Sequence, residues 1–127
     1  MQKIYEMLMN DLDSAFTSII TTNAREGRIM FRNEICEMIS KLPAPRIYVT
    51  PEYAMRVVRG YPRCGALKNS LKMKQQAEIR RRYYSLPPNM RTLSNLAKVL
   101  AEPAECFYVN PQQISIILYK VLHAKKN

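Results

Sequence analysis

Pro43-Ala44-Pro45-Arg46-Ile47-Tyr48-Val49-Thr50-Pro51 occurs twice in this chain, the second time as Pro103-Ala104-Glu105-Cys106-Phe107-Tyr108-Val109-Asn110-Pro111. The apolar residues that follow also recur, and their i, i+3, i+4, i+7 spacing is typical of one face of a helix. The matching residues are Ala54, Val57, Val58 and Tyr61 in the first copy and Ile114, Ile117, Leu118 and Val121 in the second. The sequence therefore predicts two copies of one small helical unit.

Each repeated motif reads as an extended connector that leads into a helix. Pro43 and Pro45 cannot lie inside a helix, and each biases the residue before it toward an extended backbone. Thr50 and Asn110 are both able to cap a helix, and the proline after each suits the first helical position. Two interpretations remain open: the connector only sets the angle between two helices, or it presents the following helix for recognition, as in helix-turn-helix folds.

The periodicity predicts an all-α protein, a tandem duplication of a three-helix, helix-turn-helix-like unit with short extended connectors. We expect a first helical unit over residues 1–62 and a second, more basic one over residues 63–127, sharing one core. The extended pieces at 47–49 and 107–109 are candidates to pair as a short ribbon. The expected helices cover residues 3–20, 30–40, 51–59, 67–86, 92–100 and 111–123, and Thr21-Thr22-Asn23 with Gly27 should end the first.

Positive charge dominates the sequence and is unevenly distributed. The chain has 20 Lys and Arg against 10 Asp and Glu, a net charge of +10. Residues 1–63 hold nine basic and seven acidic residues, whereas residues 64–127 hold eleven and three. Such a field favours a polyanionic partner. Nucleic acid is the leading candidate for this partner, and an acidic protein is the second. The third possibility is that the basic surface binds no polyanion.

Several classes of protein are disfavoured by the composition. We find no apolar run long enough to span a membrane and no signal peptide at the start of the chain, so we expect a cytoplasmic protein without membrane insertion. The three cysteines, Cys36, Cys64 and Cys106, lack metal-binding spacing, and we expect reduced thiols with Cys36 in the core. There is no glycine-rich phosphate loop and no catalytic constellation, so the sequence predicts a non-enzyme without cofactor or metal.

Basic residues cluster in two places that could contact nucleic acid. One group lies in and after the first connector, and the other lies on the basic helix of the second copy, where tyrosines follow the arginines. The first group is Arg46, Arg56, Arg59 and Arg63, and the second is Lys72, Lys74, Arg80, Arg81 and Arg82. A solvated helix face without a partner is the alternative interpretation. The positions of the second copy that match Arg56, Arg59 and Arg63 are Ile116, Tyr119 and His123, so the basic face is not repeated.

One further pattern carries a family resemblance. Arg82-Tyr83-Tyr84, the apolar helix from Leu93 to Leu100 and the motif from Pro103 to Pro111 together resemble a group of small helical proteins of Bacteroides-type gut bacteria, some encoded near prophage or mobile elements. That group has no assigned activity, so the resemblance implies a helical fold and a link to mobile DNA but no chemistry. The first copy departs from the pattern, because residues 3–20 replace the basic helix.

These observations favour a non-enzymatic protein that binds duplex DNA, with a regulatory role linked to mobile DNA. The alternative is a helical interaction module or adaptor with a basic surface. In that case the partner would be an acidic protein or a second copy of the chain.

Overall fold

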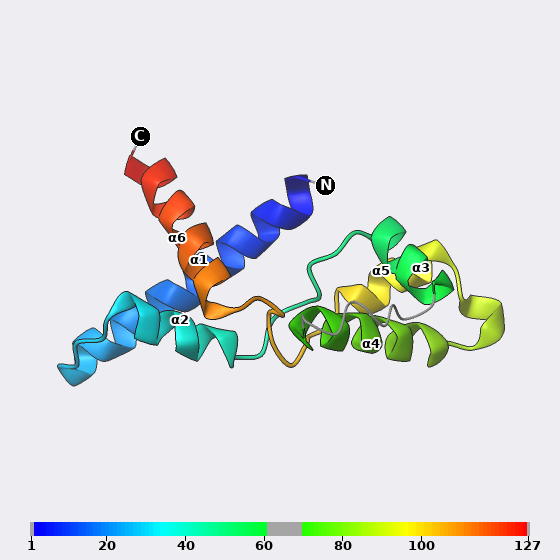
Figure 1. Cartoon of the computed structure of the whole chain (residues 1–127), viewed down its shortest axis with the longest axis horizontal. Helices are drawn as coiled ribbons and strands as arrows, with labels where there is room; N and C mark the ends of the chain where they lie inside the picture. The colour runs from blue at the N-terminus through cyan, green and yellow to red at the C-terminus, as the bar shows by residue number, and fades with distance from the viewer. Residues whose placement is uncertain (1, 61–69, 127) are drawn as a thin grey trace. The chain divides into compact units, whose positions relative to one another are not determined.

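The computed structural model describes residues 2–60 and 70–126, and this part of the chain is helical, as the periodicity predicts (Figure 1). In chain order the elements are α1 (Gln2–Glu26), α2 (Arg32–Ser40), α3 (Pro51–Arg59), α4 (Ser70–Tyr84), the short 3-10 helix η2 (Pro88–Met90), α5 (Leu93–Leu100) and α6 (Pro111–Lys126). In the described ranges no helix is long and apolar enough to cross a membrane.

Helix α1 is longer than predicted, because the expected break at Thr21-Thr22-Asn23 does not occur. These residues continue the helix to Glu26, and Asn23 is buried. The helix ends at Gly27, which has a φ of 70°. The Gly27 amide donates to the Ala24 carbonyl, and the Arg28 amide donates to the Asn23 carbonyl. This is a Schellman cap, whose left-handed residue favours glycine, so the glycine and not the polar triplet ends the helix.

The chain forms two compact units, and they are not the two predicted halves. The first consists of residues 1–43 and 109–127 and is called the split unit here; the second consists of residues 44–108 and is called the continuous unit. In the split unit α6 packs against both α1 and α2, and in the continuous unit α3 packs against both α4 and α5. Helix α3 therefore packs on the two helices that precede the second motif, and α6 packs on the two that precede the first, whereas the sequence suggested a boundary near residue 62.

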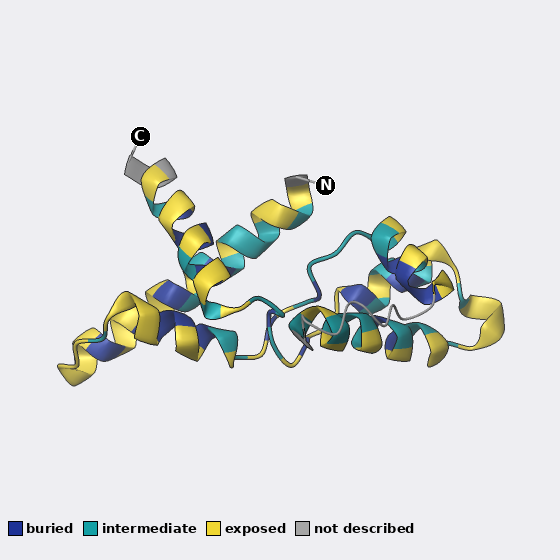
Figure 2. Cartoon of the chain, in the orientation of Figure 1, coloured by how far each residue is buried: buried dark blue, intermediate teal, exposed yellow. Residues whose placement is uncertain are grey.

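Each unit has its own apolar core, as the buried positions in Figure 2 show. In the split unit the core side chains come from the inward faces of α1, α2 and α6, and they include Leu12, Phe16, Ile35, Cys36, Ile39, Ile114 and Leu118. In the continuous unit they come from α3, α4, α5 and the connectors, and they include Ile47, Val57, Val58, Ile79, Leu96, Leu100 and Phe107. Cys36 is a buried free thiol, as predicted for this residue. Cys64 lies outside the described residues.

The two connectors meet, but they do not form the predicted ribbon. Ala44 and Ala104 make a single antiparallel bridge, in which each amide donates to the other residue's carbonyl at 2.9 Å. Beyond this bridge the Ile47 amide donates to the Leu100 carbonyl at the end of α5, and the Tyr48 ring stacks on Phe107 with 5.8 Å between centroids. Beyond the bridge, the described residues of the connectors are thus held by the stacked side chains and by the C-terminal carbonyl of α5, and not by further strand hydrogen bonds.

The helices after the two connectors begin in the same way. The Thr50 hydroxyl accepts a hydrogen bond from the Tyr53 amide at the start of α3. The Asn110 side-chain oxygen accepts one from the Gln113 amide at the start of α6, at 2.8 Å. Each cap is followed by a proline, so both predicted helix starts are confirmed.

Candidate nucleic-acid interface

Most of the positive charge belongs to the continuous unit. Residues 44–108 contain twelve Lys and Arg and four Asp and Glu, a net charge of +8, whereas the split unit contains eight and six. The packing of α3 on α4 and α5 contributes to this imbalance, since it places Arg56 and Arg59 in the same unit as the basic residues of α4. A polyanion is therefore attracted mainly to the continuous unit.

A shallow hollow of about 440 Å³ lies on this unit between α3, the end of α4 and the start of α5. We call it the arginine groove. It is lined by Glu52, Met55, Arg56, Arg59, Tyr83, Arg91, Thr92 and Leu93. Three arginines, one carboxylate and several apolar or aromatic side chains thus share one concave surface.

Arg56 and Arg59 are the free cations of the groove. Both side chains are exposed on α3, and among the described residues no carboxylate lies within ion-pair distance of either. The Arg56 guanidinium carbon lies 5.9 Å from the centroid of the Tyr53 ring, one turn earlier on the helix. Their charges are therefore available to a ligand.

Arg91, by contrast, is held in place by the fold. Its Nε donates to the Leu86 carbonyl at 3.1 Å and its Nη2 donates to the Tyr84 carbonyl at 3.0 Å. Its guanidinium carbon lies 5.1 Å from the centroid of the Tyr84 ring, whose hydroxyl donates to the Val58 carbonyl of α3. Since a guanidinium has five N–H donors, this arrangement fixes the cation and leaves donors for a ligand.

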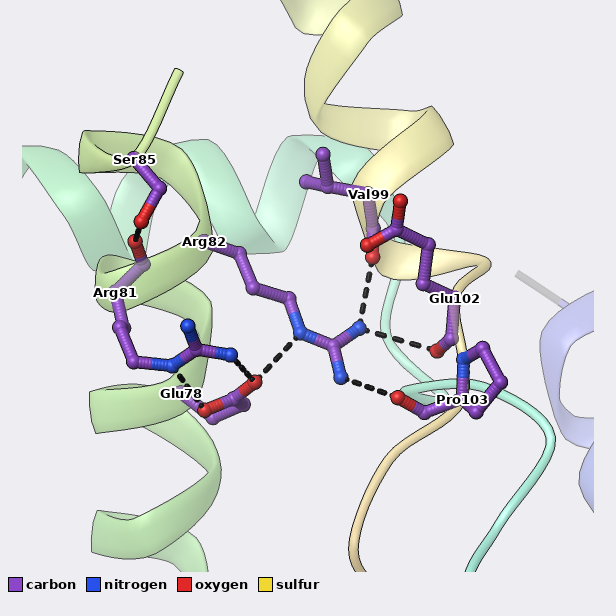
Figure 3. A network of polar contacts seen from close by, with 7 residues as sticks. All are labelled: Glu78, Arg81, Arg82, Ser85, Val99, Glu102 and Pro103. Atoms are coloured by element: carbon purple, nitrogen blue, oxygen red, sulfur yellow. Dashed lines mark hydrogen bonds and ion pairs between the residues drawn. The ribbon is translucent and has the colours of Figure 1, made fainter.

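Arg82 has a different environment, which Figure 3 shows. The residue is 8% exposed, and its side chain extends from α4 to the end of α5 and the second connector. Nε donates to the Glu78 carboxylate at 2.7 Å, Nη1 donates to the carbonyls of Val99 and Glu102, and Nη2 donates to that of Pro103. Hydrogen bonds from Arg81 and Arg82 lower the pKa of Glu78 to about 2. The Arg82 guanidinium therefore donates its hydrogen bonds to partners within the unit.

The other predicted contacts are spread over different environments. Lys72, Lys74 and Arg81 are exposed on α4, and Arg81 forms an ion pair with Glu78. Arg80 is half-buried, and its buried Nε has no hydrogen-bond partner among the described residues. The Nε of Arg46 donates to the Ile47 carbonyl in the first connector. Arg63 lies outside the described residues.

The groove thus combines two residues that the sequence singled out with one that it did not. Arg56 and Arg59 were predicted from their spacing after the first connector. Arg91 has no periodic context, because it sits between η2 and the Thr92 cap of α5. The sequence around Arg91 shows only that it precedes a helix cap. Basic side chains are common in such loops and often have no function, so this position did not single it out. Only the packing of α3 on α5 brings these arginines together.

Comparisons with protein-family models, with curated proteins and with solved structures found no match to this chain. In the described part of the chain, no group of three or more His, Cys, Asp or Glu side chains is placed to hold a metal ion.

Proposed function

We propose that this protein binds duplex DNA without catalysing a reaction, through the continuous unit and with α3 as the contacting helix. The observation that carries the proposal is the arginine groove, in which Arg56 and Arg59 are exposed, and form no ion pair with a described residue, beside the fixed Arg91. Arginines at such a surface hold phosphates, and their release of counterions makes binding depend strongly on salt. The exposed Lys72 and Lys74 of α4 extend the same unit's positive charge.

We further infer that the chain is a tandem duplication of a helical unit. The matching caps of α3 and α6 support this, and so does the bridge between Ala44 and Ala104, which are equivalent residues of the two motifs. Reciprocal pairing of equivalent residues is typical of contacts about a twofold axis. A regulator built in this way, acting on mobile DNA in the cytoplasm, would agree with the family resemblance.

The test is a titration of a labelled duplex at several salt concentrations. We expect binding at about 50 mM salt and micromolar protein, with an affinity that falls steeply as salt rises. The double variant Arg56→Ala/Arg59→Ala should reduce the salt slope by about two, because roughly 0.9 of a unit is lost per phosphate contact.

The matched control is Arg25→Ala/Arg28→Ala, which removes the same charge from exposed positions of the split unit. It should change the slope far less. Equal effects of the two double variants would show that net charge alone drives binding. Failure to bind any duplex at low salt would refute the proposal.

An interaction module remains the second candidate, and a feature of the split unit favours it. Ile29 and Phe31, in the loop between α1 and α2, are 92% and 70% exposed. Contiguous exposed apolar patches are typical of surfaces that bind other proteins, and these two side chains would be the centre of such a patch. Sedimentation of the wild type and of Phe31→Ser would test for a homodimer, which should weaken in the variant.

A further inference from the structure

We infer that the arginine groove holds one unpaired nucleotide, so that the protein prefers DNA with a single-stranded overhang to a blunt duplex. This inference rests on the proposed function, because it assigns a ligand to the same surface. It differs from that proposal in requiring a base, and not only a phosphate, at the groove.

The groove contains apolar surface that a phosphate contact does not need. Met55 and Leu93 line it together with the Tyr83 ring, and Leu93 is 44% exposed at the first position of α5. Surfaces that bind single strands combine cations that hold the backbone with apolar and aromatic groups that cover the bases. The volume of about 440 Å³ lies within the range of small-ligand sites.

The cations are placed so that a phosphate would be held from two sides. Arg56 and Arg59 are three residues apart on α3, so they lie on one face of that helix. Arg91 reaches the same groove from the segment before α5, and its Nη1 has no hydrogen-bond partner among the described residues. A guanidinium that is already fixed loses little conformational entropy when it binds, which favours a localised phosphate site.

Glu52, the one carboxylate among the described residues that line the groove, determines which end of the nucleotide lies at which end of the groove. Glu52 lies seven residues before Arg59 on α3, which separates the two positions by about 10 Å along the helix. A carboxylate repels phosphate, but it accepts hydrogen bonds from the exocyclic amino group of a base such as cytosine. We therefore place the base near Glu52 and Leu93, and its phosphate near Arg59 and Arg91.

A base inside a duplex cannot occupy this position unless it leaves the stack, which costs a few kcal/mol. An overhang offers the base without that cost. The protein should therefore bind overhang DNA more tightly than blunt DNA. The same argument predicts that the preference depends on the apolar side chains of the groove.

The experiment compares a labelled blunt duplex with the same duplex carrying a short 3′ cytosine overhang, at one salt concentration. We expect at least fivefold tighter binding of the overhang DNA, since one stacked base contributes about 1–3 kcal/mol. Leu93→Ser should abolish this preference, read as the ratio of the dissociation constants of the same variant for blunt and overhang DNA. The control is Ile116→Ser, which alters a similarly exposed apolar residue of α6 and should keep the preference.

A second variant covers the case in which Leu93→Ser does not fold. Glu52→Gln should reduce the advantage of cytosine over thymine in the overhang, because an amide can donate to thymine as well as accept from cytosine. If blunt and overhang DNA bind equally while duplex binding persists, the nucleotide site is refuted and the proposed function stands. If neither DNA binds, both proposals fail.

Discussion

Helices α3 and α6 follow the same sequence motif, yet only their buried faces are alike. Ala54, Val57 and Val58 are buried in α3, and Ile114, Ile117 and Leu118 are buried at the matching positions of α6. The exposed positions differ in chemistry, because Arg56 and Arg59 of α3 correspond to Ile116 and Tyr119 of α6. The packing of each unit constrains the buried face, while the exposed face is free to serve a different partner.

The units around the two helices differ in charge, as the exposed faces of the helices do. Helix α3 packs in the unit with a net charge of +8, and α6 packs in the nearly neutral unit, where its exposed Tyr119 ring lies 4.2 Å from that of His123. Under the proposed function, the continuous unit binds the polyanion and the split unit does not. The predictions that follow test this contrast.

The largest loss of stability should come from a cavity in the core beneath α6. Leu118 is completely buried, so Leu118→Ala should reduce the free energy of unfolding by about 3 kcal/mol or more. Hydrogen exchange should then increase in α1, α2 and α6 while α3, α4 and α5 stay protected, because α6 packs on α1 and α2 of the split unit. The matched variant Val58→Ala should reverse this pattern, with a smaller loss. Equal deprotection of all helices by both variants would contradict the division into two packing units.

Removal of the Arg82 guanidinium should be nearly as costly. Arg82→Ala removes the donor of the Glu102 and Pro103 carbonyls and one of the two donors of the Val99 carbonyl. We expect the free energy of unfolding to fall by about 3 kcal/mol, measured by urea unfolding. Arg81→Ala is the control, because Arg81 is exposed and its ion pair with Glu78 is screened by solvent, so its removal should lower the free energy of unfolding much less than the removal of Arg82 does. If the two variants behave alike, the Arg82 network does not stabilise the fold.

Acid should weaken the continuous unit through Glu78. Its pKa is about 2 in the folded protein against an ordinary value of 4.5, so its stabilising contribution is complete above pH 4.5 and is lost as the pH falls toward 2. Thermal melts between pH 6 and 2 should show this loss in the wild type. Glu78→Gln should be less stable near neutral pH and should show a flatter dependence over the same range. A wild-type curve as flat as that of the variant would argue against the ion pair.

The smallest effect on stability should come from exchanging the exposed faces. Arg56→Ile/Arg59→Tyr gives α3 the surface of α6, and Ile116→Arg/Tyr119→Arg does the reverse. Since all four positions are exposed, each double variant should change the free energy of unfolding by less than about 0.5 kcal/mol per residue. DNA binding should nevertheless weaken in the first variant. The second should add only a general electrostatic attraction, because the arginine groove requires Arg91 and α5.

The sequence was sufficient to predict the helices and several of their ends. The periodic apolar positions and the caps at Thr50 and Asn110 are local features, and local features fix helix starts through hydrogen bonds within one turn. The end of α1 was misjudged because a polar triplet only mildly disfavours a helix, whereas burial of Asn23 and the glycine cap determine where it stops. Arg56 and Arg59 were recognisable from their spacing on one helix, but Arg91 was not.

The sequence by itself determined that the chain is helical, strongly basic and built around a repeated connector, because composition and periodicity are properties of neighbouring residues. Only the tertiary structure decided that α3 packs on α4 and α5, that Arg82 is bound internally and that Arg91 joins Arg56 and Arg59. These outcomes depend on which apolar faces bury each other over long sequence separations. No periodicity within one helix specifies its partner, so the arginine groove exists only once α3 has packed against α4 and α5.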